Sequence, residues 1–69
     1  MSIKEQIIAK SDEIAELKYK LQYTDYKAIK YAEGELSAEE YAETKAQRKA
    51  WREEIGALEA EIINLKKQE

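Results

Sequence analysis

Residues 31–41 read Tyr-Ala-Glu-Gly-Glu-Leu-Ser-Ala-Glu-Glu-Tyr, and this stretch decides the fold because it can stop one helix and start another. Gly34 is the only glycine between two long segments with helical periodicity, and glycine commonly ends a helix by adopting the left-handed conformation. Ser37 and Glu40 then have the spacing of a capping box, in which each side chain bonds the backbone N–H of the other residue. We therefore predict a short connection over residues 34–36.

The chain on either side of this turn favours helices. It contains no proline and only two glycines, and Ala, Glu, Lys, Ile and Leu dominate a composition that suits helices. Ser2 and Glu5 repeat the capping-box spacing near the start of the sequence. We predict helices over residues 3–33 and 38–67, within a single domain of residues 1–69.

The apolar spacing of the two segments predicts how they pack. A connection this short forces the helices to lie antiparallel. When the chain is folded about the turn, residues at 3-4 spacing pair in layers whose two residue numbers have a constant sum. The predicted layers are Tyr31–Tyr41, Ala28–Thr44, Thr24–Arg48, Leu21–Trp51, Leu17–Ile55, Ile14–Leu58 and Ile7–Leu65. A seam that keeps this register is typical of coiled coils, so we predict an all-α, antiparallel two-helix coiled-coil hairpin.

The residue types exclude most of the chemistry used by enzymes. The chain has neither cysteine nor histidine, which removes thiolate and imidazole metal ligands, cysteine nucleophiles and the most common general base. We therefore expect no enzymatic activity, no catalytic residues, no cofactor site and no metal site.

Charge and hydropathy narrow the class of partner. Fifteen acidic and twelve basic residues give a net charge of −3 with the signs mixed along the chain, whereas nucleic-acid binding needs a clustered basic face. No run of apolar residues is long enough to cross a membrane, and residues 1–10 lack the apolar stretch of a signal peptide. We expect a cytoplasmic protein that binds protein partners and binds neither nucleic acid nor membranes.

A polar group interrupts the predicted seam. The register brings Thr24 and Asp25 of the first helix near Arg48 and Arg52 of the second, with Asp25 within reach of both arginines. Such a layer fixes register and orientation in coiled coils, which is our main interpretation. The alternative is an arginine pair presented to an anionic group of a partner; a catalytic interpretation lacks a base, a nucleophile and a pocket.

The aromatic residues form a second candidate site. Tyr19, Tyr23 and Tyr26 follow the spacing of a helical stripe, and Trp51 lies near them in the predicted register. The rings either extend the core of a slender hairpin or form a protein-binding surface, because tyrosine and tryptophan are enriched at interface hot spots. Stacking on nucleic-acid bases is a weaker alternative, because no basic groove accompanies the rings.

Further isoleucines lie off the seam and predict a wider apolar face. These residues are Ile3, Ile8, Ile29 and Ile63. Self-association of two hairpins into a homodimeric four-helix bundle would cover them, and a different protein is the other possible partner. Gly56 costs helix stability in the interior of the second segment, so we expect another group to approach closely there.

Three segments resemble proteins of phages and prophages. They are TDYKAIKYAEGE within residues 21–35, EEYAE within residues 37–45, and QRKAWREEI over residues 47–55. The pattern resembles helical hairpins of small proteins encoded near tail genes, and the C-terminal parts of tail-fibre assembly proteins. The residues that carry the shared signature are Thr24, Asp25, Arg48, Trp51 and Arg52.

The resemblance implies a non-enzymatic role in virion assembly. On this interpretation the chain is a protein-binding module in the cytoplasm of the host cell or on the virion, with a phage protein as partner. The alternative is a small phage inhibitor that blocks a host defence enzyme by covering its surface. An inhibitor of a nucleic-acid enzyme would be expected to present an acidic face, and a charge of −3 with mixed signs favours the assembly role.

Overall fold

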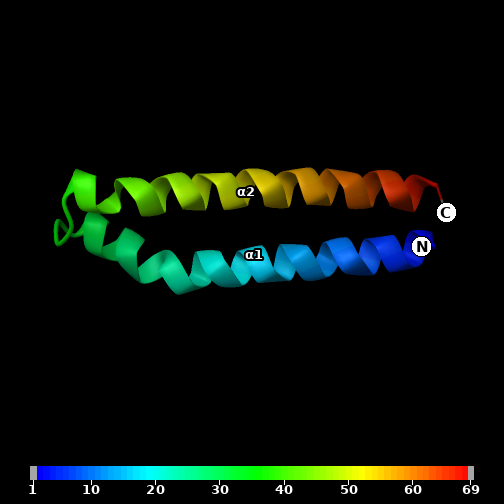
Figure 1. Ribbon diagram of the computed structural model, residues 1–69, viewed down its shortest axis with the longest axis horizontal. Coiled ribbons are helices and arrows are strands. Elements are labelled where there is room, and N and C mark those ends of the chain that lie inside the picture. Colours follow the sequence, from blue (N-terminus) through cyan, green and yellow to red (C-terminus); the bar gives the residue numbers. More distant parts are fainter. Residues whose placement is uncertain (1, 69) are drawn as a thin grey trace.

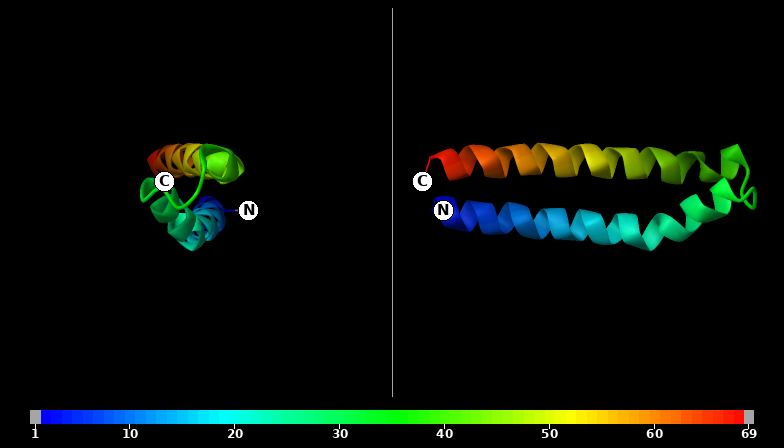
Figure 2. Two further views of the ribbon diagram at one scale, coloured as in Figure 1. Left: turned by 90° about the vertical axis from the view of Figure 1, so that its left-hand side faces the viewer. Right: turned by 180° about the vertical axis from the view of Figure 1, so that it is seen from behind.

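The computed structural model describes residues 2–68, which form two long helices. Helix α1 spans Ile3–Ala32 and helix α2 spans Ala38–Lys67. The helices lie side by side and run in opposite directions, so α1 begins and α2 ends at the same end of a slender rod, as Figures 1 and 2 show. The principal extents of the molecule are 49 × 15 × 15 Å. The predicted all-α helical hairpin is confirmed.

Backbone hydrogen bonds at Gly34 end α1. Gly34 has a φ of 83°, and its N–H donates to the carbonyl of Tyr31 (3.1 Å) while the N–H of Glu35 donates to the carbonyl of Lys30 (2.8 Å). This pair of bonds is the Schellman motif, which satisfies carbonyls that lack partners at a helix C-terminus. The helix ends at Ala32, one residue before the predicted boundary, because the next residue already serves as the cap.

Both helices begin at a serine cap, and the two caps differ. The complete capping box forms at Ser37, whose Oγ accepts from the N–H of Glu40 (3.1 Å) while the Glu40 carboxylate accepts from the N–H of Ser37 (3.1 Å). At Ser2 the Oγ accepts from the N–H of Glu5 (3.1 Å), but the Glu5 carboxylate accepts from the serine hydroxyl (3.1 Å). The capping box predicted at Ser2 therefore forms only in part.

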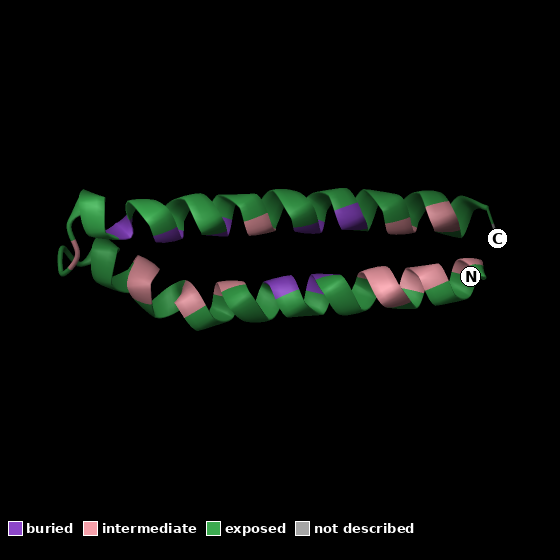
Figure 3. Cartoon of the chain, viewed as in Figure 1, coloured by how far each residue is buried: buried purple, intermediate pink, exposed green. Residues whose placement is uncertain are grey.

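The core is a narrow seam between the helices. Figure 3 shows the buried residues of each helix facing the other helix. The apolar centre of the seam consists of Ile14, Leu17, Ile55 and Leu58, with Leu21, Trp51 and Ile62 packed against it. Near the turn the rings of Tyr31 and Tyr41 stack with centroids 4.7 Å apart, as the predicted register requires.

Helix α1 is bent. Figure 1 shows the bend in the teal part of α1, whose colour corresponds to residues 20–25. There the hydroxyl of Thr24 lies within hydrogen-bonding distance of the carbonyls of Lys20 (3.0 Å) and Leu21 (3.1 Å), and Arg48 Nη1 donates to the same Leu21 carbonyl (2.7 Å). Side-chain donors that insert into the backbone hydrogen-bond ladder bend helices, so the polar layer accounts for the bend.

Candidate protein-binding surface

Arg48 is the centre of the polar layer. Its side chain comes from α2, is only 7% exposed, and donates from Nη1 to the hydroxyl of Thr24 (2.8 Å) and from Nη2 to the carboxylate of Asp25 (2.9 Å). With the bond to the carbonyl of Leu21 (2.7 Å), three hydrogen bonds attach this guanidinium to α1. The predicted pairing of Thr24 and Asp25 with Arg48 is therefore present, and the group acts as a layer that ties the helices together.

The two arginines of the predicted site have different surroundings. Arg48 faces α1, and its Nε is buried without a hydrogen-bond partner among residues 2–68. Arg52 is exposed and forms no ion pair with Asp25, whose ion-pair partner within those residues is Arg48. The prediction that Asp25 reaches both arginines is wrong for Arg52, because Arg48 occupies the side of α1 that carries the carboxylate. Arg48 and Arg52 therefore do not form a pair of exposed guanidinium groups that could bind an anionic group of a partner.

Three tyrosines project from α1 into solvent. Tyr19 is 68% exposed, Tyr23 is 69% exposed and Tyr26 is 49% exposed, so the interpretation of these rings as an extension of the core is wrong. We call these three residues the aromatic flank. Exposing so much aromatic surface on one face of one helix is the usual mark of an interface rather than of a core.

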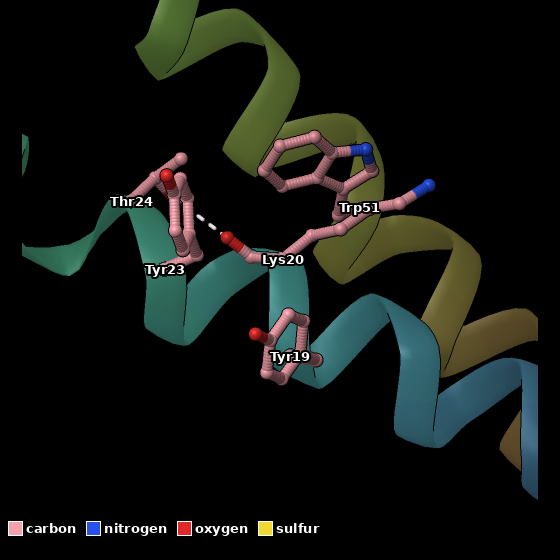
Figure 4. Close-up of a pocket in the computed structure, with 5 residues that line it drawn as sticks. All are labelled: Tyr19, Lys20, Tyr23, Thr24 and Trp51. Atoms are coloured by element: carbon pink, nitrogen blue, oxygen red, sulfur yellow. Dashed lines mark hydrogen bonds between the residues drawn. The ribbon is translucent and has the colours of Figure 1, made fainter.

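A recess adjoins the aromatic flank. It has a volume of about 230 Å³ and is lined by Tyr19, Lys20, Tyr23, Thr24 and Trp51. Figure 4 shows that the indole of Trp51 reaches it from α2 while the other side chains come from α1. A cavity of about 150 Å³ is enough to hold benzene, so the recess is large enough for one aromatic ring of a partner.

Lys20 also belongs to this surface, although the residues predicted from the sequence did not include it. Its Nζ lies 6.0 Å from the centre of the Trp51 ring, at the outer limit of a cation–π contact. In the same way, Nζ of Lys30 lies 5.8 Å from the ring of Tyr26. The signal was present in the register, because Lys20 precedes Leu21, the residue predicted to pair with Trp51.

The off-seam isoleucines are only partly as predicted. Ile8, Ile29 and Ile63 are exposed, whereas Ile3 is partly buried because it lies four residues before Ile7 and so continues the seam. The expectation of a close approach at Gly56 is also wrong within the described residues, since a Cβ added there would meet no atom within 4 Å.

Within residues 2–68 there is no cluster of three or more acidic, histidine or cysteine side chains placed to hold a metal ion. Neither α1 nor α2 contains an apolar stretch that is long enough to cross a membrane.

Comparisons with known proteins identify no relative. No family model, no curated protein and no solved structure matches this chain. The function must therefore be inferred from the aromatic flank, the recess and the charges around them.

Proposed function

We propose that this chain is a non-enzymatic protein-binding module, that it acts as a virion assembly or accessory protein, and that it does so in the cytoplasm of the host cell or on the virion. The observation that carries the proposal is the exposure of Tyr19, Tyr23 and Tyr26 on one helix of a hairpin. Binding through this flank would remove a large apolar surface from water.

The chemistry of the flank suits a protein partner. Tyrosine and tryptophan combine a large apolar ring with few rotatable bonds, so they lose little conformational entropy when they bind. Burying one large apolar side chain contributes about 1.5–3 kcal/mol, and three exposed rings supply several such contributions. The recess beside Trp51 adds a concave point at which one side chain of a partner can anchor.

The virion role rests on the resemblance of three sequence segments to phage proteins. Thr24 and Tyr26 lie in the first of these segments, and Trp51 lies in the last one. Thr24 and Trp51 line the recess, and Tyr26 belongs to the aromatic flank. The segments that resemble tail-associated hairpins therefore include part of the surface that we propose for binding.

Site-specific photo-cross-linking tests this proposal. A photoreactive phenylalanine analogue replaces Tyr23 in one variant and Glu53 in a control variant, in the organism that encodes the chain. Both positions are exposed, but Glu53 lies on α2, outside the aromatic flank. We expect covalent adducts from position 23 and none from position 53, with a virion structural or assembly protein among the adducts identified by mass spectrometry.

Each outcome decides part of the proposal. If position 23 yields no adduct, the aromatic flank is not a binding surface. If it yields adducts without any virion protein, the flank binds protein but the virion role is wrong. Equal adducts from both positions would mean that the cross-linking reports only random collisions.

A further inference from the structure

The geometry points to a second copy of this chain as a partner of the aromatic flank, with the two α1 helices packed antiparallel about a two-fold axis. This inference rests on the proposed function, because it names the occupant of the same surface. It also narrows the expected four-helix arrangement, since the α1 helices would meet each other and the α2 helices would lie outside.

The exposed face of α1 has the spacing of a second seam. Exposed residues at 3-4 spacing run along the side of α1 that faces away from α2, and they are Asp12, Glu16, Tyr19, Tyr23, Tyr26 and Lys30. The seam between α1 and α2 follows the same spacing. A stripe of this kind can pair with a copy of itself when the two helices run in opposite directions.

One register places the aromatic rings together at the symmetry axis. In it Tyr19 faces Tyr23 of the second copy, and the symmetry repeats this layer. Alongside, Ala15 faces Ile29 of the second copy, which pairs a small side chain with an exposed large one. The exposed apolar residues in the middle and at the turn end of α1 are then covered together.

The charges of α1 select this antiparallel register. Asp12 and Glu13 lie in the first half of α1, and Lys27 and Lys30 lie in its second half. Asp12, Glu13 and Lys30 are exposed, and Lys27 is partly buried. In the register above, Asp12 faces Lys30 of the second copy and Glu13 faces Lys27, and each pair occurs twice. None of these four charges has an ion-pair partner within residues 2–68, where the ion pairs are Lys10–Glu61 and Arg48–Asp25. A parallel arrangement would instead place like charges together.

Charge reversal with complementation tests the register. One variant carries D12K and E13K, and the other carries K27E and K30E. Each variant alone places like charges at every one of these pairs, so we expect its dimer dissociation constant to rise roughly tenfold or more. Mixing the two variants restores opposite charges at all four pairs, so we expect a heterodimer to form in the mixture. The measurement is sedimentation velocity over a range of concentrations.

A matched control separates the register from a general effect of charge. The double substitution E43K and E53K makes the same change in net charge as D12K with E13K, at two exposed residues of α2 outside the proposed interface. We expect this variant to dimerise as the wild-type chain does. Circular dichroism of each variant at low concentration checks that the hairpin is folded.

A second variant tests the position of the symmetry axis. In the proposed register the two Lys20 side chains face each other near the axis, where like charges oppose association. We therefore expect K20Q to lower the dimer dissociation constant, whereas Y23A should raise it by roughly tenfold or more. Because Tyr23 is 69% exposed, Y23A should leave the helical signal of the hairpin unchanged.

These results are distinguishable from those that test the proposed function. A wild-type chain that sediments as a monomer at all concentrations, or a mixture of the charge variants that forms no heterodimer, would overturn the second copy as the occupant. Cross-links from position 23 to another protein would still support the binding surface in that case.

Discussion

Arg48 of α2 is fixed to Thr24 of α1 by a hydrogen bond of 2.8 Å from Nη1 to Oγ1. The Thr24 hydroxyl also lies 3.0 Å from the carbonyl of Lys20, so the guanidinium, the hydroxyl and the backbone of α1 form one connected group. This group sets the register of the two helices and bends α1 at the same place. A single layer thus couples the pairing of the helices to the direction in which the aromatic flank points.

Replacing Arg48 tests what this layer contributes to stability. We expect R48A to lower the free energy of unfolding by about 2–4 kcal/mol, because it removes the buried stem and leaves space in the seam. We expect R48M to change it by about 1 kcal/mol or less, because methionine fills much of the space of the arginine stem. The side chain of Asp25 is 54% exposed, so removing Arg48 does not leave a buried charge without a partner. Urea unfolding followed by circular dichroism measures both values. Equal losses in the two variants would show that the hydrogen bonds, and not the packing, dominate.

Local chemistry made the hairpin predictable from the sequence. Gly34 and the Ser37–Glu40 pair act on their own backbone, so their effect does not depend on distant residues. The register follows from the 3-4 spacing alone, and the contacts of Tyr31 with Tyr41 and of Thr24 with Arg48 have the predicted partners.

The details of the candidate site were less predictable. Spacing places Cα atoms in layers, but it does not determine which acceptor a long side chain reaches, and Arg48 found the Leu21 carbonyl as well as Asp25. Arg52 was assigned to the same carboxylate for that reason and lies in solvent instead. Whether Tyr19, Tyr23 and Tyr26 are covered depends on contacts with a second molecule, and the residue spacing within one chain does not determine such contacts.

The two glycines should respond in opposite ways to alanine. Gly56 is an exposed helical residue at which an added Cβ would meet no atom within 4 Å, so G56A should raise the free energy of unfolding by about 1 kcal/mol. Gly34 has a φ of 83°, a conformation that costs an L-residue about 1–2 kcal/mol, so G34A should lower it. Thermal melting of both variants against the wild-type chain measures the two shifts. Destabilisation by G56A would mean that another copy or partner packs there.

The apolar seam should carry most of the stability. Leu17 is 6% exposed and belongs to the centre of the core, so L17A should lower the free energy of unfolding by about 2–5 kcal/mol. Ile29 lies on the same helix but is exposed, so I29A should change the free energy of unfolding of the isolated hairpin by about 0.5 kcal/mol or less. Urea titration at low protein concentration compares them. A large loss from I29A with a small one from L17A would contradict the register of the seam.

Acid should weaken the start of α2 through Glu40. The hydrogen bond from the backbone N–H of Ser37, followed by the one from its side chain, lowers the pKa of the Glu40 carboxyl below its ordinary value of 4.5. A carboxyl whose pKa is lower in the folded state stabilises that state at pH values above the ordinary pKa, and it loses this effect as the pH falls through the lowered pKa.

The E40Q variant removes the titration of residue 40 while keeping an oxygen that accepts the hydrogen bond. We expect the melting temperature of the wild-type chain to exceed that of E40Q near neutral pH, with the difference shrinking as the pH falls below 4.5. The other carboxyl groups titrate in both proteins, so the difference isolates this capping box. A difference that stays constant through the acid range would mean that ionisation of Glu40 does not contribute to the start of the helix.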